Sequence, residues 1–316
     1  WNRYPRSLRA GVIAVIAFLS GGLFLAIAPP AEFTLATIDI PQGTSAREAA
    51  RILSDAHIVK HPSLLRFVLR VSGSSDLIRA GLYRFSTPQN LLTVAYRIVA
   101  GGYGIPPVRI TFFEGETVRD DAERIENAFT VISAAAFEKA ARPHEGYLFP
   151  DTYTFPPGTD VATIIKTMRD TFDAKLEPLT DDIGVSGRSL ADIITMASLI
   201  EKEVRTSENR RIVSGILWNR IKLDMPLQVD AVFGYIFNRD TYSPSFEDLK
   251  VDSPYNTYTH KGLPPGPIDN PGLDAIDAAL HPAKTKYLYY LTGSDNQMHY
   301  ATTYAGHVAN QKKYLR

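Results

Sequence analysis

The sequence contains no cysteine, and this absence excludes disulfide bridges, thiolate metal sites and a cysteine nucleophile. A surplus of charge is missing as well, because 34 Lys and Arg residues balance 34 Asp and Glu residues and the pI is near 7.2. Since nucleic-acid-binding domains are usually basic, this balance argues against a nucleic-acid partner. The composition is otherwise that of an ordinary globular protein.

Motifs of several common enzyme classes are also missing. The chain has no G-x-S-x-G elbow, no S-x-x-K in a plausible context and no G-x-x-x-x-G-K phosphate loop, which argues against esterase, penicillin-binding and nucleotide-hydrolysing functions. His57 and His61 stand four residues apart, but the residues between them lack the glutamate of a zinc-protease helix. We therefore expect no metal site and no cofactor.

One hydrophobic run, residues 10–31, is long enough to cross a membrane. It carries no charge, and at about 1.5 Å per residue it spans a hydrocarbon layer of about 30 Å. Arginines precede the run and acidic residues follow it, which predicts that residues 1–9 are cytoplasmic and that the rest lies outside the plasma (inner) membrane. A cleaved signal peptide or a buried helix is the alternative, but the run is longer than a usual signal sequence and lacks a convincing cleavage site.

The soluble part divides at a stretch rich in glycine and proline, residues 101–107. Before it, in residues 32–105, strand-like and helical runs alternate, which predicts a small α+β module. Residues 106–316 are mostly helical, with aromatic strands near the C-terminus. The long helices predicted there cover residues 160–179, 189–205 and 208–221. The predicted fold class is α+β, with an N-terminal transmembrane helix and a larger, mainly helical second domain.

The most informative predicted helix covers residues 189–205 and reads SLADIITMASLIEKEVR. Its apolar residues recur at helical spacing and define a face that includes Glu201, whereas Glu203 points roughly to the opposite side. A buried carboxylate costs several kcal/mol if it is ionised and unpaired, so we expect Glu201 to be protonated, ion-paired or functional. The pattern leaves two interpretations open, a structural pair with Arg205 or Arg211 and a general acid with a raised pKa.

Two other segments combine aromatic rings with carboxyl or amide groups, which suits the faces and hydroxyls of sugars. The first, residues 145–155, includes Glu145 and Tyr147. In the second, residues 225–235, an extended conformation would set Gln228 and Asp230 on one side. Either pattern is equally compatible with a structural role.

The late segment 253–272 differs in kind from the rest of the chain. It is rich in proline, glycine and asparagine, so it cannot form a regular helix or strand and is expected to be a shaped loop. Long ordered loops in compact domains often carry function.

Five motifs, taken together, resemble those of the endolytic murein transglycosylases, the MltG or YceG-like family. They are EGYLFPDTY, ASLIEKEV, the LQ-x-D of residues 227–230, the NTY-x-x-x-GLPPGPI of residues 256–268 and the A-x-HPA of residues 279–283. The resemblance extends over nearly the whole chain. It implies that residues 32–105 form a LysM-like subdomain and that residues 106–316 form the catalytic transglycosylase domain.

The resemblance also implies a reaction. Such an enzyme is a lyase (EC 4.2.2 type) that cleaves the β-1,4 bond between N-acetylmuramic acid and N-acetylglucosamine within a peptidoglycan strand, leaving a 1,6-anhydromuramoyl end. The family's catalytic glutamate lies in the A-S-x-x-E-K-E stretch, and the residue matched to it is Glu201. Because the attacking 6-hydroxyl belongs to the substrate, neither a second carboxylate nor a metal is expected. The substrate-binding residues expected are Gln228, Asp230, Asn256, Tyr258, Glu145 and Tyr147.

The partners implied by the resemblance are the glycan strands of peptidoglycan, the membrane, and peptidoglycan synthases (penicillin-binding proteins) whose nascent strands the enzyme would terminate. A different class remains as the alternative, a membrane-anchored peptidoglycan-binding or scaffold protein of the cell-wall synthesis machinery. A second alternative is a two-carboxylate muramidase that uses Asp230 or Glu145 as nucleophile or water-activating base. The cleaved strand distinguishes these three functions: a transglycosylase leaves an anhydro end, a muramidase leaves a reducing end, and a scaffold protein leaves the strand uncut.

Overall fold

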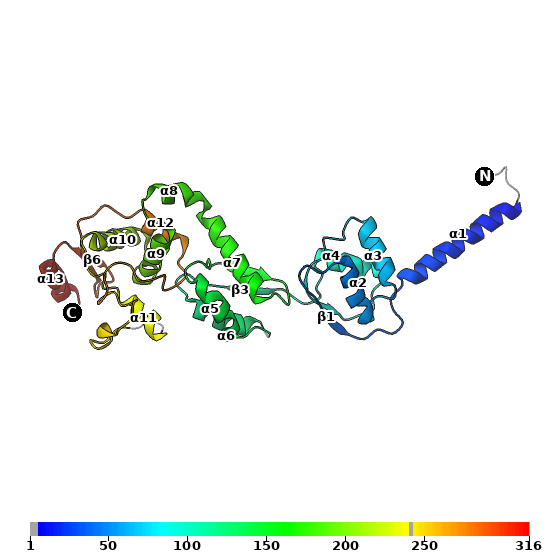
Figure 1. Cartoon of the computed structure of the whole chain (residues 1–316), viewed down its shortest axis with the longest axis horizontal. Coiled ribbons are helices and arrows are strands. Elements are labelled where there is room, and N and C mark those ends of the chain that lie inside the picture. Colours follow the sequence, from blue (N-terminus) through cyan, green and yellow to red (C-terminus); the bar gives the residue numbers. More distant parts are fainter. Residues whose placement is uncertain (1–5, 130, 240–242, 316) are drawn as a thin grey trace. The chain divides into compact units, whose positions relative to one another are not determined.

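The structure, a computed structural model, describes residues 6–129, 131–239 and 243–315. It divides into two compact units. The first consists of Trp1–Val108 and Thr154–Thr159, and the second of Arg109–Tyr153 and Asp160–Arg316. Both contain helices and short strands, so the predicted mixture of the two is confirmed (Figure 1).

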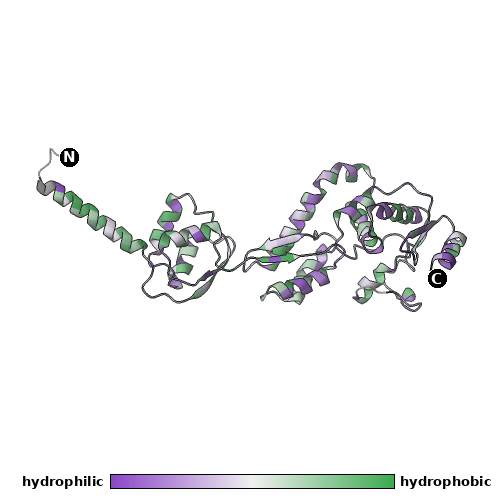
Figure 2. Cartoon of the chain, turned by 180° about the vertical axis from the view of Figure 1, so that it is seen from behind, coloured by the Kyte–Doolittle hydropathy of each residue, from purple (hydrophilic) through white to green (hydrophobic). Residues whose placement is uncertain are grey.

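The helix α1 (Arg6–Ile27) coincides with the hydrophobic run, and Figure 2 shows it as mostly hydrophobic along its length. None of its segment Arg9–Ile27 is buried. By length and composition this segment can cross a membrane, although a signal sequence near the N-terminus has the same properties. The helix ends before residue 31, the last residue of the predicted run, because Pro29 and Pro30 follow it. A residue that precedes proline is disfavoured in the helical conformation.

The first unit is built on an antiparallel pair of strands, β1 (Ala36–Ile40) and β2 (Gly81–Phe85). The helices α2 (Ala46–Asp55) and α3 (Pro62–Val71) lie between these strands in the sequence, and α4 (Leu91–Ala100) follows them. Apolar side chains from all five elements form a single buried core. The element order of the two strands and the helices between them is therefore β-α-α-β.

Local signals set the ends of these helices. Ser45 caps α2 by accepting a hydrogen bond of 3.2 Å from the backbone N–H of Glu48, and Asn90 caps α4 by accepting one of 2.8 Å from Thr93. Gly101 ends α4 in the left-handed conformation, with φ of 76°. Each of these ends depends only on neighbours in the chain.

The helix α9 (Leu190–Glu203) is the central helix of the second unit. Its residues from Ile193 to Ile200 are all buried. The helices α10 (Ser207–Lys222), α11 (Ala231–Phe237) and α12 (Leu273–Leu280) pack against it (Figure 1). This middle part of α9 is covered on all sides, whereas Ala191, Asp192 and Lys202 near its ends are exposed. The side chain of Glu201 is buried, as predicted, but Glu203, predicted to point to the opposite side, is partly buried as well.

The remaining elements belong to the second unit, except that β3 and β4 each cross the boundary between the two units. They are β3 (Val108–Thr111), α5 (Val118–Ala128), α6 (Ala134–Ala141), β4 (Thr152–Phe155), α7 (Val161–Leu176), α8 (Thr180–Val185), β5 (Tyr289–Thr292), β6 (Met298–Ala301) and α13 (Tyr304–Tyr314). Three 3₁₀ turns lie at Arg142–His144, Glu177–Leu179 and Asp248–Lys250. Strand β3 pairs with β4, and β5 pairs with β6 in an antiparallel hairpin.

The segment 225–235 differs from the predicted extended run. Gln228 adopts a left-handed conformation with φ of 54°, and its backbone N–H donates to the carbonyl of Thr257 at 3.1 Å. Asp230 then occupies the cap position of α11, which begins at Ala231. The extended prediction is wrong because a contact with a distant loop bends the chain and starts a helix.

Candidate active site

Glu201 lies in a closed cluster of ion pairs and hydrogen bonds. Its side chain is 6% exposed and forms an ion pair with Arg210, which is 9% exposed. The other carboxyl oxygen, Oε2, accepts a hydrogen bond of 3.0 Å from the backbone N–H of Gly272. Arg210 also donates to Asp274 at 2.7 Å and to the carbonyl of Val204 at 3.0 Å. Glu201 thus joins the end of α9 to α10 and to the start of α12.

Two effects act in opposite directions on the protonation of Glu201. The pKa of Glu201 lies above its usual value, because burial and the carboxylates of Glu114 and Asp274 raise it more than the Gly272 N–H and the Arg210 guanidinium lower it. Both carboxyl oxygens therefore have partners that stabilise the charged form. Among the described residues, Glu201 is not part of the lining of either large cavity of this unit.

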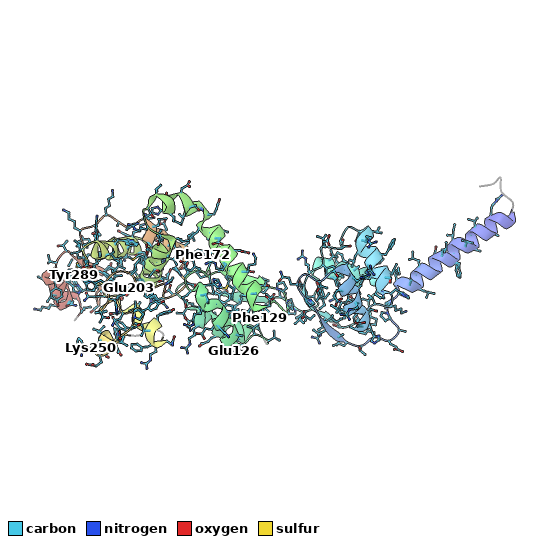
Figure 3. All side chains as sticks on the ribbon, in the orientation of Figure 1. Glu126, Phe129, Phe172, Glu203, Lys250 and Tyr289 are labelled. Atoms are coloured by element: carbon cyan, nitrogen blue, oxygen red, sulfur yellow. The ribbon has the colours of Figure 1, made fainter. Side chains whose placement is uncertain are left out.

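Glu203, which Figure 3 labels, is the last residue of α9. It lines a cavity of about 740 Å³ in the second unit. Cavities of this volume are typical of sites that hold small molecules or short chain segments. Other residues of the lining include Thr117, Asp120, Arg142, Glu145, Lys202, Asp230, Tyr235 and Tyr255. Glu203 thus faces this cavity, whereas Glu201 does not line it.

Burial raises the pKa of Glu203 to about 7, and the nearby carboxylate of Asp230 acts in the same direction. Two hydrogen bonds oppose this rise. The Tyr290 hydroxyl donates to Oε2 at 2.9 Å, and the backbone N–H of Ala231 also donates to the carboxylate. A carboxyl group that titrates near neutral pH can both donate and accept a proton during a reaction.

Asp230 and Tyr258, two of the predicted site residues, lie together. The Tyr258 hydroxyl donates to Oδ1 of Asp230 at 2.5 Å. Burial raises the pKa of Tyr258, so the phenol keeps its proton and remains a donor. Because Asp230 lines the cavity of Glu203, it can supply negative charge where a cation develops.

Glu145 lines the same cavity from another part of the chain. It accepts a hydrogen bond of 2.8 Å from the backbone N–H of Val118, at the start of α5, and burial raises its pKa to about 7. Tyr147 is not part of this lining, and its ring packs against Phe172 with ring centroids 5.3 Å apart. The site therefore holds two carboxyl groups, Glu145 and Glu203, that titrate near neutral pH.

The other two predicted cleft residues have structural contacts. Asn256 is fully buried, and its Nδ2 donates to the carbonyls of Leu249 at 3.0 Å and Val251 at 2.9 Å. Gln228 accepts a hydrogen bond of 3.2 Å from Arg220. Among the residues that the structure describes, neither belongs to the lining of the cavity of Glu203. Both shape the loops that carry Asp230 and Tyr258.

The proline-rich loop is held against α9 and the segment around Glu145. The backbone N–H of Ile268 donates to Ser198 Oγ at 3.0 Å, and Oδ1 of Asn270 accepts from the N–H of Gly146 at 2.8 Å. A Cβ atom at Gly146 would lie 2.3 Å from Cγ of Pro267, so only glycine fits there. The proline-rich loop, α9 and the segment around Gly146 are far apart in the sequence, and these contacts hold them together.

Sequence reasoning missed three tyrosines of this region. Tyr290 contacts Glu203 from β5, and the rings of Tyr235 and Tyr255 lie 5.0 Å apart on the cavity wall. The aromatic strand around Tyr290 is visible in the sequence, but nothing there indicates which ring reaches Glu203.

The cavity brings together carboxyl groups and tyrosine hydroxyls, which are the groups that acid–base chemistry needs. The profile of the YceG-like family matches residues 38–313. The endolytic murein transglycosylase of Bacillus subtilis (strain 168) is 31% identical over 326 residues, which cover 95% of this chain and 90% of that protein. The chain belongs to the YceG-like family, as its motifs predicted.

Two further relatives agree with this assignment. The endolytic murein transglycosylase of Streptococcus pneumoniae serotype 2 (strain D39 / NCTC 7466) is 29% identical over 321 residues, covering 88% of this chain but only 58% of its own length. The 2.6 Å crystal structure of a yceG-like protein from Listeria monocytogenes superposes with a TM-score of 0.59 at 28% identity. That match covers 88% of this chain and 99% of the Listeria chain.

Proposed function

We propose that this chain is an endolytic murein transglycosylase, a lyase that cleaves the β-1,4 bond between N-acetylmuramic acid and N-acetylglucosamine within peptidoglycan strands. The relatives of that name support the reaction class. The observation that carries the proposal is the position of Glu203, a carboxyl group with a pKa raised to about 7 on the wall of a cavity of about 740 Å³.

Glu203, rather than the predicted Glu201, is the proposed acid and base. Both lie in the ASLIEKEV motif, so the motif alone does not separate them. Glu201 is engaged by Arg210 and Gly272, and breaking a buried ion pair costs about 3–5 kcal/mol. A substrate would have to displace these partners, whereas Glu203 already lines the cavity.

The reaction proceeds in two proton transfers. Protonated Glu203 donates to the glycosidic oxygen as the bond to C1 of the muramoyl residue breaks and positive charge develops at C1. The Glu203 carboxylate then takes the proton of the muramoyl 6-hydroxyl while that oxygen bonds to C1. The proton returns to Glu203, no water is consumed, and a 1,6-anhydro end forms. Asp230 stabilises the transient cation.

A two-carboxylate muramidase is a second candidate, favoured by one observation. Glu145 lines the same cavity, and burial raises its pKa to about 7. As a base it would activate water and give a reducing end in place of the anhydro end. The two products differ in mass by one water molecule, so mass spectrometry of the fragments separates the two reactions.

The test of the proposal compares two isosteric variants on purified peptidoglycan. Glu203→Gln should lower the yield of anhydro-ended fragments by about 100-fold or more, because an amide cannot supply the proton. Glu201→Gln, two residues away on the same helix, should still produce them under conditions in which the variant stays folded. Wild-type activity of Glu203→Gln would return the catalytic role to Glu201 or Glu145.

The proposal also includes the location of this protein in the cell. The apolar helix α1 supports a single-pass anchor in the plasma (inner) membrane, with residues 1–9 in the cytoplasm and the soluble units outside it. The β-α-α-β order of the first unit supports a LysM-like glycan-binding module at residues 32–105. Peptidoglycan synthases are the partners proposed for an enzyme that terminates nascent strands. Recovery in the membrane fraction, with soluble units open to external protease, tests the topology.

A further inference from the structure

Arg220, near the end of α10, is a buried cation that hydrogen-bonds only to uncharged acceptors. Its side chain is 5% exposed, and its Cζ lies 5.0 Å from the ring centroid of Tyr289. In the part of the chain that the structure describes, no carboxylate forms an ion pair with it. A guanidinium keeps its charge when it is buried, and a buried charge without a counter-ion is costly. Its presence needs a reason beyond packing.

The guanidinium joins two segments that are far apart in the sequence. Nε donates to the carbonyl of Leu288 at 2.7 Å. Nη1 donates to the carbonyls of Pro226 at 3.1 Å and Leu227 at 2.8 Å, and to Oε1 of Gln228 at 3.2 Å. Arg220 therefore fixes both segments to the same point of α10.

Each of these segments carries a group that acts on Glu203. Leu288 stands two residues before Tyr290, whose hydroxyl donates to Oε2 of Glu203 at 2.9 Å. Leu227 stands three residues before Asp230, whose carboxylate raises the pKa of Glu203. Without the guanidinium, the two segments would lose the bonds that fix them relative to each other.

The positive charge also acts on the phenols around it. Four titratable side chains face Arg220, namely Tyr258, Tyr289, Tyr290 and His307. Burial raises the pKa of Tyr258 and of Tyr290, and Arg220 opposes this rise in both. A hydroxyl polarised by a nearby cation donates a stronger hydrogen bond. The cation therefore strengthens the bonds from these hydroxyls to the carboxylates of Asp230 and Glu203.

We propose that Arg220 is a positioning residue for the reaction, which holds the Tyr290 hydroxyl and the Asp230 carboxylate at Glu203 through the backbone segments that carry them. The inference rests on the proposed function and deepens it. Arg220 acts through other residues and does not touch the substrate, since it is not among the described residues that line the cavity of Glu203.

Two variants separate the geometry of Arg220 from its charge. Arg220→Gln removes the charge and the fork of donors, whereas Arg220→Lys keeps a positive charge but lacks the planar fork that reaches both segments. The matched control is Arg188→Gln in the same unit. Arg188 also donates to a backbone carbonyl, that of Leu280 at 3.3 Å, and its Cζ lies 4.4 Å from the ring centroid of Trp218. For the full chain in detergent, kcat and KM for strand cleavage are measured against pH.

Arg220→Gln should lower kcat by about tenfold or more, because a small displacement of reacting groups is costly. Its KM should stay within about twofold of the wild type, since no contact with the substrate is lost. The pH profile of kcat/KM should move to higher pH, because a weaker donor to Glu203 raises the pKa of that carboxyl group. Arg220→Lys should lose kcat to a similar extent and keep the wild-type profile. Arg188→Gln should match the wild type in kcat and in the profile.

Three outcomes would overturn the proposal. A wild-type pH profile in Arg220→Gln would leave this residue a structural role only. A raised KM with unchanged kcat would mean that Arg220 binds the substrate. Wild-type kcat in Arg220→Lys would refute the positioning role, and this variant keeps the proposal testable if Arg220→Gln does not fold, which thermal unfolding of each variant establishes.

Glu203→Gln separates this proposal from the proposed function. If that variant cleaves strands like the wild type, the assignment of the acid has failed. If it is inactive while both Arg220 variants behave like the wild type, only the positioning role has failed.

Discussion

Tyr290 donates a hydrogen bond of 2.9 Å from its hydroxyl to Oε2 of Glu203, which joins β5 to the last residue of α9 across 87 residues of sequence. The hydrogen bond stabilises the charged carboxylate and lowers the pKa of Glu203, against burial and Asp230, which raise it. The protonation of the proposed acid is therefore set by elements far apart in the chain.

Tyr290→Phe removes this hydrogen bond and keeps the ring. The pKa of Glu203 should rise, because a group that stabilised its charged form is gone. The pH profile of kcat/KM for strand cleavage should then move to higher pH, which a purely structural role would not cause. Tyr304→Phe, at an exposed ring outside this network, is the control. An unshifted profile in Tyr290→Phe would contradict the assignment of Glu203 as the titrating group.

Glu201→Gln should destabilise the protein more than it impairs the reaction. It leaves the buried Arg210 without its charged partner, and breaking a buried pair costs about 3–5 kcal/mol. Urea unfolding measures this loss. Asp170→Asn is the comparison, because it breaks an exposed pair with Lys166 whose contribution is about 0.5 kcal/mol. Equal midpoints for the two variants would show that the cluster around Glu201 does not stabilise the fold.

Asp269→Ala should stabilise the protein. Asp269 is fully buried, and in the described structure neither of its carboxyl oxygens has a hydrogen-bond partner. Burial raises its pKa well above the usual range, and Glu201 and Glu145 act in the same direction while Lys202 opposes them. An unsatisfied buried polar group costs about 1–3 kcal/mol, and alanine removes it.

The stabilisation by Asp269→Ala should depend on pH with a definite sign. Since the pKa in the folded state lies above that in the unfolded state, the folded protein binds the proton more tightly, and this contribution to stability is lost as pH rises above about 4. The advantage of the alanine variant should therefore grow between pH 4 and neutral pH. At neutral pH it should amount to about 1–3 kcal/mol in the free energy of unfolding, measured with urea. A wild type that is more stable than the variant at neutral pH would disprove this account.

Gly146→Ala should disturb the wall that carries Glu145. Its φ of +82° is unfavourable for alanine, and a Cβ atom would lie 2.3 Å from Cγ of Pro267. Strain and overlap together should cost about 2–4 kcal/mol. Gly187→Ala is the matched control in the same unit, since Gly187 has a φ of +70° but no atom within 4 Å of the added Cβ.

Gly187→Ala should cost about 1 kcal/mol from backbone strain alone. The difference between the two variants, measured by thermal unfolding, reports the packing of Gly146 on the proline-rich loop. Similar losses for both would mean that this contact is not close-packed in solution.

The amino-acid sequence alone determined features that depend on neighbouring residues or on motifs. The alternating strands and helices predicted for residues 32–105 are present, for example the strand Gly81–Phe85 and the helix α3 that begins at Pro62, because alternation and proline geometry act over a few residues. The family followed from five motifs in order, which are likewise properties of the linear chain. The strands and helices of the first unit could therefore be predicted from the sequence without knowledge of any tertiary contact.

The proposal of Glu203 over Glu201 rests on the tertiary structure alone. Helical periodicity placed Glu201 on the buried face and turned Glu203 away, but packing covers the middle of this helix on all sides, so periodicity carries no information about which side is a cavity. The partners that engage Glu201 lie nine and 71 residues away, at Arg210 and Gly272. A cavity exists only where distant segments fail to fill space together, and no local pattern encodes that.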